Sequence, residues 1–268
     1  MTLFTLGPEG TFSDEVTRGL AGKTGQEVRL LPTIHAIFPE VERGAGDGIV
    51  PIENSEAGGV GPTLDGLRES RVFITGECMM PIHHNLASFV PLEEITVIYS
   101  HPQSHEQSGI LLDSLEIPVI HTSSNAASAV AMQKEKTSAA VVSSRIAELY
   151  RLPLIREGIE NNPDNTTRFI RISAKRGCED LAEKCSLVID PETDCPGLLY
   201  MILGVFARRQ INLSRIESRP SRKGLGSYIF FIDVAKTRDL PAALHDLREI
   251  TQFRELGCYS DLGVNAWK

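Results

Sequence analysis

The feature that most constrains this chain is a regular alternation, over residues 1–175, between short apolar runs and longer amphipathic stretches. The runs have the length and composition of strands, and they cover 2–6, 27–31, 47–53, 95–100, 118–122, 138–144 and 167–173. The stretches between them are compatible with helices, at 12–22, 33–43, 103–115, 124–135 and 144–150. This alternation predicts an α/β fold with parallel sheets flanked by helices. The length suits two such lobes with a ligand in the cleft between them.

The pattern changes after residue 173. Charged residues become frequent and the apolar periodicity ends over 174–185, which predicts a linker. The remaining chain reads as a strand, a helix, two strands around a Gly-rich turn, a helix and a last strand. This βαββαβ order is that of the ferredoxin-like fold. We therefore expect two domains, at residues 1–176 and 185–268.

The net charge argues against one large class of partners. The chain carries −8 at neutral pH, whereas proteins that bind nucleic acids through their phosphates rely on clustered Lys and Arg. No apolar stretch approaches the roughly 20 residues of a membrane span, and the first residues lack the basic segment of a secretory signal. We expect a cytoplasmic protein without a membrane partner. Its cysteines, odd in number and without a CxxC pair, are expected to be reduced.

Small polar residues open a helix directly after a strand at three places, 7–15, 99–107 and 122–130. Helix N-termini leave backbone N–H groups free and carry a partial positive charge, so each is a potential seat for a carboxylate or phosphate. In the second segment, Ser100 and Gln103 have capping-box spacing, and Gln107 lies near the same helical face. Ordinary N-caps explain any one segment. Three of them at strand ends make a small, doubly anionic ligand a reasonable alternative.

Two further segments admit both a structural and a chemical interpretation. At 50–67, Glu53 is either a general acid or, together with Asn54, part of the hydrogen bonding of a loop. At 161–169, the sequence "NNPDNTTRF" is either a loop of turn residues before a strand or the start of a site. The residue types alone leave both pairs of interpretations open.

Histidines occur as the adjacent pair His83 and His84 and, at helical i,i+4 spacing, as His101 and His105. Neither pair has the Glu of the HExxH zinc motif, and Pro102 places the second pair at a helix start. We therefore expect no metal site. The sequence also contains no Walker loop, GxGxxG or GxSxG motif, so nucleotide, hydride and catalytic-triad chemistry lack support.

Six motifs together carry a family resemblance: "GPEGTFS" (7–13), "PIENSEAGGV" (51–60), "SHPQ" (100–103) with Gln107, "NTTRF" (165–169), "PGLLYMILGVF" (196–206) and "INLSRIESRP" (211–220). With them the sequence resembles the prephenate dehydratases over essentially its whole length. The resemblance implies a cofactor-free enzyme that converts prephenate to phenylpyruvate, water and carbon dioxide on the route to phenylalanine. It also implies a two-lobed catalytic domain similar to type II periplasmic binding proteins, and a C-terminal ACT domain that binds phenylalanine as feedback inhibitor.

The resemblance assigns roles to individual residues. Thr167, in the TRF motif, is implied to act at the leaving hydroxyl, and we interpret it as a hydrogen-bond donor because a Thr hydroxyl is a weak acid. The other catalytic positions implied are Glu53, Asn54, Ser100 and Gln107. We expect further substrate contacts from Thr11, Ser55, Ser124, Asn165, Arg168 and Phe169. For Arg168 an ion pair that braces the strand, and for Phe169 a place in the core, are equally open.

The C-terminal motifs imply a phenylalanine site at a subunit interface, and hence a homodimer or homotetramer. The residues implied are Gly197, Leu198, Asn212, Leu213, Glu217, Ser218, Arg219 and Pro220. The sequence has "PGLL" where the family more often has "GALL", which leaves the identity and potency of the effector open. Two other functions also stay open: an arogenate dehydratase, and a non-catalytic amino-acid sensor.

Overall fold

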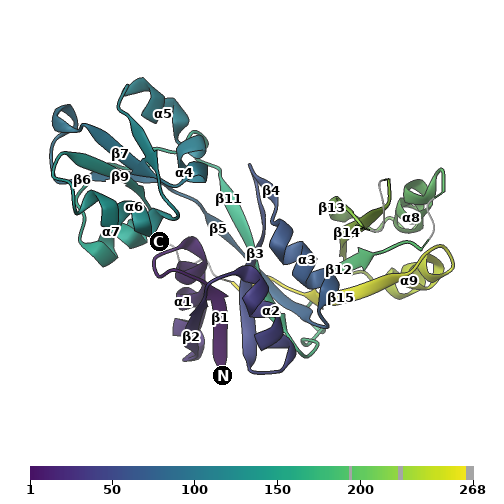
Figure 1. Cartoon of the computed structure of the whole chain (residues 1–268). Coiled ribbons are helices and arrows are strands. Elements are labelled where there is room, and N and C mark those ends of the chain that lie inside the picture. Colours follow the sequence, from purple (N-terminus) through teal and green to yellow (C-terminus); the bar gives the residue numbers. More distant parts are fainter. Residues whose placement is uncertain (193–194, 223–225, 264–268) are drawn as a thin grey trace.

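The structure is a computed structural model that describes residues 1–192, 195–222 and 226–263. Within these ranges the strands form three sheets, each with its own helices (Figure 1). Two sheets belong to a pair of α/β lobes, and the third belongs to a βαββαβ unit near the C-terminus. The predicted fold class, two α/β lobes followed by a ferredoxin-like unit, is therefore confirmed. No helix in the described part of the chain is long and apolar enough to cross a membrane.

The first lobe contains a mixed sheet. Its strand order is β2 (Glu27–Leu31), β1 (Thr2–Leu6), β3 (Gly46–Asn54), β11 (Thr166–Ser173) and β5 (Phe73–Pro81), and the short β4 (Gly58–Gly59) pairs with β3. Its helices are α1 (Phe12–Thr24), α2 (Ile34–Glu42) and α3 (Gly61–Glu69). Strand β1 is parallel to β2 and β3, whereas β11 is antiparallel to β3 and β5. The prediction of parallel sheets is wrong for this half, because β11 returns from the second lobe and enters the sheet in the opposite direction.

The second lobe has the strand order β10 (Leu154–Arg156), β6 (Asn85–Ser88), β9 (Ser138–Val142), β7 (Val97–Ser100) and β8 (Val119–His121). Its helices are η1 (Leu92–Glu94), α4 (Pro102–Gln107), α5 (Gly109–Ser114), α6 (Asn125–Met132) and α7 (Ser144–Tyr150). Strand β7 is parallel to β8 and β9, whereas β6 is antiparallel to β9 and β10. Both lobes are thus mixed α/β layers rather than purely parallel ones.

Two crossover segments join the lobes, residues 82–84 after β5 and residues 157–165 before β11. Glu160 of the second crossover contacts the first one. Its carboxylate accepts a hydrogen bond from the His84 backbone N–H at 2.9 Å and pairs with His83 Nδ1 at 2.7 Å. The second lobe is therefore one continuous segment inserted into the first. Strand β11, which lies between β3 and β5, is the last strand of the first lobe along the chain.

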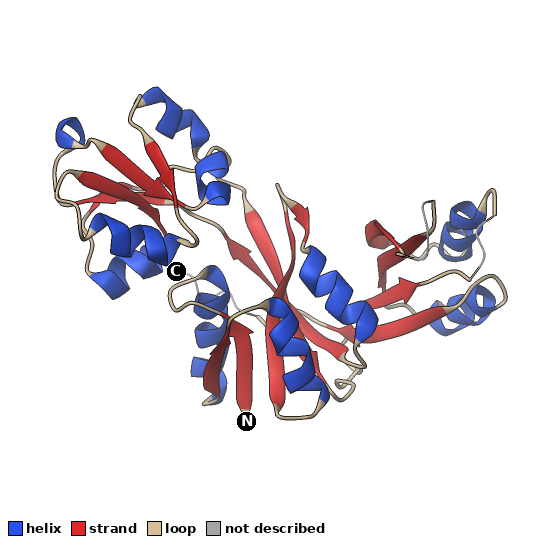
Figure 2. Cartoon of the chain, in the orientation of Figure 1, coloured by secondary structure: helices blue, strands red, loops and turns tan. Residues whose placement is uncertain are grey.

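The third sheet has the order β13 (Leu213–Pro220), β14 (Tyr228–Ala235), β12 (Lys184–Ile189) and β15 (Phe253–Tyr259). Helices α8 (Leu198–Ala207) and α9 (Leu240–Arg248) cover the face turned away from the first lobe (Figure 2). On the opposite face Val188, Phe231 and Leu256 belong to one buried cluster with Phe38 and Ile74 of the first lobe. The third unit and the first lobe thus share a hydrophobic core.

A disulfide joins two strands of the third sheet. Cys185 in β12 and Cys258 in β15 lie directly opposite each other, with Cα atoms 4.0 Å apart. The expectation of reduced cysteines is wrong for this pair, because antiparallel pairing brings two sequence-distant side chains to the same point of one face. Cys78, Cys178 and Cys195 are free, and burial raises the pKa of the Cys78 thiol to about 12.

Candidate active site

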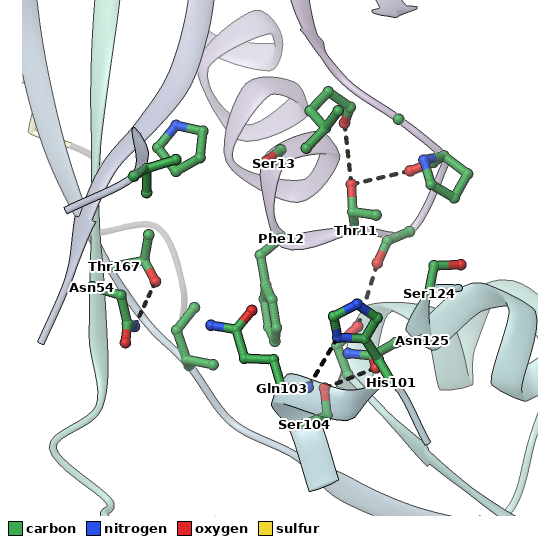
Figure 3. A pocket seen from close by; sticks show the side chains of 18 of the residues that line it. Thr11, Phe12, Ser13, Asn54, His101, Gln103, Ser104, Ser124, Asn125 and Thr167 are labelled. Carbon is green, nitrogen blue, oxygen red and sulfur yellow. Dashed lines mark hydrogen bonds between the residues drawn. The ribbon is translucent and has the colours of Figure 1, made fainter. Parts of the chain in front are cut away.

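A cavity of about 380 Å³ has walls from both lobes (Figure 3). Thr11, Asn54 and Thr167 line it from the first lobe, and Gln103 and Ser124 line it from the second. Its polar groups are hydroxyls, amides and imidazoles, and none of the described residues that line it is Lys, Arg, Asp or Glu. An anion in this cavity therefore meets neutral hydrogen-bond donors and helix ends.

Thr167 and Asn54 form a hydrogen-bonded pair on the side of the cavity wall that belongs to the first lobe (Figure 3). Asn54 Nδ2 donates a hydrogen bond to Thr167 Oγ1 at 2.9 Å, and Asn54 Oδ1 accepts from the backbone N–H groups of Glu56 and Ala57 at 3.1 and 2.9 Å. These backbone donors fix which end of the Asn54 amide is the donor. Since the Thr167 oxygen accepts from Asn54, its own hydrogen is left to donate elsewhere.

Ser55 and Asn165, both expected to contact substrate, are absent from the described lining of the cavity. Asn165 is fully buried, and its Oδ1 accepts from Asn54 Nδ2 at 2.7 Å. Ser55 Oγ accepts from the backbone N–H of Thr166 at 3.0 Å. Both residues lie behind the wall and support the paired strand ends that hold Asn54 and Thr167, so their contact with substrate stays a prediction.

Side chains cap two helices at the edge of the cavity. Thr11 Oγ1 accepts from the Asp14 backbone N–H at 3.3 Å at the start of α1, and Ser124 Oγ accepts from the Ala127 backbone N–H at 3.0 Å at the start of α6. Thr11 and Ser124 both line the cavity. The positive ends of α1 and α6 are therefore directed to the space where an anion would bind.

The capping of α4 differs from the prediction. Its N-cap is His101, whose Nδ1 accepts from the Gln103 backbone N–H at 3.3 Å. Ser100 is fully buried, and its Oγ donates to the His101 carbonyl at 3.1 Å. Ser100 is not among the described lining residues, because the last residue of β7 faces the interior, and its catalytic role stays a prediction.

Gln107 lines the cavity, and its side chain contacts that of His84, which lines the cavity too. Gln107 Oε1 lies 3.0 Å from His84 Nε2, and both side chains belong to the wall. Burial lowers the pKa of the His84 imidazole, although the bond to Gln107 acts in the other direction. From the sequence, His84 stood out only as a candidate metal ligand. No local signal pointed to the cavity, because β5, which ends three residues before His84, was not predicted.

Successive residues of β11 face opposite sides of the sheet, as the period of a strand requires. Thr167 and Phe169 line the cavity, and Phe169 is also buried in the core of the first lobe, so its two interpretations are compatible. Arg168, between them, faces the third sheet and is not among the described lining residues. The expectation that Arg168 contacts substrate is corrected by this alternation.

The guanidinium of Arg168 is bound on the far side of β11. It is 3% exposed and donates to Glu77 Oε2 at 2.7 Å, to Asp233 Oδ2 at 2.6 Å and to the Tyr259 hydroxyl at 2.8 Å. Burial alone would lower the pKa of this group, but Asp233, Tyr259 and Glu77 raise it overall. Arg168 is therefore an ion-pair brace between the first lobe and the third sheet.

Glu53 lies on the same side as Arg168. Its carboxylate pairs with Arg215 of β13 and approaches Arg168 Nη1 at 3.7 Å, and it is not among the described residues that line the cavity. Asn54, the next residue of β3, is the one that faces the cavity, and the catalytic role expected of Glu53 stays a prediction.

The residues expected to bind an effector are divided between the two faces of the third sheet. Glu217 and Arg219 face the first lobe: the Glu217 carboxylate lies against Gly59, and Arg219 Nη2 is 3.5 Å from Asp65 Oδ1. Ser218, between them on the same strand, faces the opposite side. The eight residues therefore do not converge on one site within a single chain.

The other expected effector residues lie at the helical side or at the edge of that sheet. Gly197 caps α8 with a left-handed φ of 88°, and Leu198 is buried in the cluster beneath α8 and α9. Leu213 packs against the same cluster, whereas Pro220 is exposed at the end of β13. Asn212 lines a second cavity of about 220 Å³.

Family models match both parts of the chain. The model described as prephenate dehydratase matches residues 3–177, and the ACT domain model matches residues 193–252. The first match covers well over half of the chain and includes both lobes. The second covers most of the third unit.

Individual proteins agree with these models. The prephenate dehydratase of Methanocaldococcus jannaschii is 37% identical over 262 residues, which are 95% of this chain and 95% of that protein. The prephenate dehydratase of Lactococcus lactis subsp. cremoris is 32% identical over 97% of this chain and 98% of its own length. The crystal structure of prephenate dehydratase from Arthrobacter aurescens in complex with L-Phe has a TM-score of 0.87 and 33% identity. It covers 97% of this chain and 90% of that one.

Proposed function

The chain belongs to the prephenate dehydratase family, and on this premise we propose how its cavity converts prephenate to phenylpyruvate, water and carbon dioxide under the control of L-phenylalanine. The observation that carries the assignment of the reaction to this cavity is the Thr167 hydroxyl. Asn54 donates to its oxygen, so its hydrogen is available to a leaving group in the cavity.

The two carboxylates of prephenate are bound by neutral donors. The N-termini of α1 and α6, capped by Thr11 and Ser124, offer backbone N–H groups and a partial positive charge. Gln103 and Gln107 add amide groups from the second lobe. Because donors come from both lobes, a substrate held by them bridges the lobes and excludes water from the space between.

Thr167 acts at the opposite end of the reaction. As the ring carboxylate leaves as carbon dioxide, its electron pair enters the ring, the carbon–oxygen bond breaks, and the hydroxyl takes up one proton and departs as water. Negative charge develops on the departing oxygen, so a donor fixed at that point stabilises the transition state more than the ground state. The hydrogen bond from Asn54 strengthens Thr167 as a donor, because hydrogen bonds in a chain polarise one another.

We assign catalysis to residues 1–176 and regulation to residues 185–268. The ion pairs of β13 with the first lobe support this division, because they connect the regulatory strand to Glu53, the neighbour of Asn54 in β3, and to Asp65 in α3. We assign L-phenylalanine to the helical side of the third sheet, near Gly197, Leu198, Leu213, Ser218 and Pro220. In this arrangement Glu217 and Arg219 transmit its binding to the first lobe.

We further propose that the protein is a cytoplasmic homodimer or homotetramer. Strand β13 is an edge strand, and Ile216 on it is 46% exposed. An uncovered edge with apolar side chains is a natural pairing surface for a second copy of the same sheet. Tyr200 on α8 and Tyr228 on β14 are also exposed, and they extend the apolar surface.

The test is phenylpyruvate formation from prephenate by the purified full chain, measured with and without L-phenylalanine. We expect turnover that changes when L-phenylalanine is added. Arogenate is assayed in parallel, and faster turnover of arogenate than of prephenate would favour an arogenate dehydratase. If the protein bound prephenate but formed no phenylpyruvate, it would be an amino-acid sensor rather than an enzyme.

A further inference from the structure

His84 lies at the base of the cleft, on the first crossover between the lobes. It is 1% exposed, its ring is in edge contact with Phe12 at 5.8 Å between centroids, and it lines the cavity. Its backbone N–H donates to Glu160 Oε2 at 2.9 Å, and its carbonyl accepts from Ile159 at 2.9 Å. The second crossover therefore fixes the backbone at His84, and the contacts with Phe12 and Gln107 hold the ring.

We assign the proton of the ring from its contact with Gln107. An amide oxygen only accepts, so with Gln107 Oε1 at 3.0 Å the His84 Nε2 is the donor in this assignment. Burial lowers the pKa of His84, and the facing ionisable groups, Glu160, Glu56 and His83, do not reverse this. The ring is therefore neutral with its proton on Nε2. Since the Gln107 oxygen is occupied by this bond, the group that Gln107 offers to the cavity is its NH₂ donor.

The other nitrogen of the same ring is an acceptor without a partner. Within the described chain, His84 Nδ1 is buried and has no hydrogen-bond partner. Buried polar atoms in folded proteins are almost always paired, with protein, water or ligand. An unpaired acceptor in the wall of a ligand cavity indicates that the ligand brings a donor to this point.

We propose that His84 Nδ1 accepts a hydrogen bond from the ring hydroxyl of prephenate and so positions the group that leaves. This inference rests on the proposed function. Ionised prephenate carries two carboxylates and a ketone, which only accept, and one hydroxyl, which also donates. The hydroxyl is thus the substrate group that matches this acceptor, and the lone pair on Nδ1 disfavours a carboxylate there. With its hydrogen on His84, the hydroxyl oxygen turns its lone pairs to Thr167.

The first test compares two ligands that differ in the hydroxyl. In His84→Gln the side-chain amide still reaches Gln107, but no acceptor remains near the position of Nδ1. We expect kcat/KM for prephenate to fall by about 10- to 100-fold, mostly in kcat. The inhibition constant of the product phenylpyruvate, which has no ring hydroxyl, should stay within about twofold. The matched control is His83→Gln, because His83 is the adjacent histidine, is half exposed and does not line the cavity.

Equal losses for prephenate and phenylpyruvate would show that His84 only supports the wall, and unchanged prephenate turnover would overturn the proposal. The second test needs no turnover. In ¹⁵N-histidine-labelled wild-type enzyme, with the His84 signals identified by their loss in His84→Gln, we expect the Nε2–H tautomer. A proton on Nδ1 would overturn the proposal even if the enzyme were active. A wild-type protein that has the expected tautomer but does not turn over prephenate would instead refute the proposed function.

Discussion

Thr166 and Thr167 are neighbours in one strand, but the structure gives their hydroxyls different surroundings. Thr167 Oγ1 accepts from Asn54 inside the cavity, whereas Thr166 Oγ1 donates to the Asp164 carbonyl at an exposed position, 3.1 Å away. Only Thr167 can reach a molecule bound in the cavity. The role of a hydroxyl at this point of the chain is therefore set by which face of β11 it occupies.

This difference predicts the effects of two matched substitutions. Thr167→Ala should lower kcat by about 100- to 10,000-fold with a smaller change in KM, because the lost hydrogen bond forms fully only in the transition state. Thr166→Ala is the control and should stay within about threefold of the wild type, as surface substitutions usually have small effects. Steady-state kinetics with prephenate measure both. Similar losses in the two variants would contradict the assignment.

At the level of single residues, the sequence located the site better than it oriented the side chains. It identified the segments around Asn54, Gln107 and Thr167, all of which reach the cavity. Glu53 and Arg168, which were also expected at the site, instead face the third sheet. The alternation of a strand already implies that Arg168 and its neighbours lie on opposite faces. The sequence contains no sign, however, that a third sheet covers one of those faces.

Among the elements, β11 connects the cavity to the third sheet. One face carries Thr167 into the cavity, and the other carries Arg168 to Asp233 of β14. The pair is nearly inaccessible, with both side chains 3% exposed. Breaking a buried ion pair by removal of one partner leaves an uncompensated charge, which is far more destabilising than the loss of a surface pair.

We therefore expect Asp233→Ala to lower the free energy of unfolding by about 3 to 5 kcal/mol. The control is Asp246→Ala, which removes a partner of Arg209 at 2.6 Å, but from a half-exposed pair, and should cost at most about 1 kcal/mol. Urea unfolding followed by circular dichroism compares the two variants. Equal, small effects would mean that the Arg168 brace contributes little to stability.

The sequence predicted some strands correctly and missed others, depending on how far each strand's pattern is set by local residues. The strand predictions for β1 and β2 agree with the structure because their apolar runs are bounded by turn residues. Strand β5 was missed because Gly76 and Glu77 interrupt its pattern. A Cβ at Gly76 would lie 2.4 Å from the Leu262 side chain, and Glu77 is buried against Arg168. Both residues make contacts with distant parts of the chain, and such contacts cannot be predicted from local periodicity.

At the scale of the whole molecule, the net negative charge of the protein repels an anionic substrate. The chain carries −8, and the described wall of the cavity has no Lys or Arg, so a dianion approaches a negative protein and is bound by neutral donors. Salt screens the long-range repulsion but has little effect on short hydrogen bonds. Added salt should therefore not weaken substrate binding here, whereas it would weaken binding to a site built on arginine.

We expect kcat/KM for prephenate to stay constant or to rise, by at most about twofold, as sodium chloride increases from about 20 to 300 mM. Initial rates across this range measure the effect, and a parallel series with potassium chloride controls for specific ion effects. A loss of several-fold with salt would indicate a cation in the site and would contradict the neutral-donor interpretation.

Because the second lobe is inserted into the first, the two lobes can be completed only in a fixed order as the chain is synthesised. The second lobe is complete once residue 156 has left the ribosome, whereas the first lobe waits for β11 as the strand between β3 and β5. The hydrogen bond between Asn54 and Thr167 joins residues 113 positions apart. Because such distant contacts form late, the growing chain carries a finished second lobe before it has any active site.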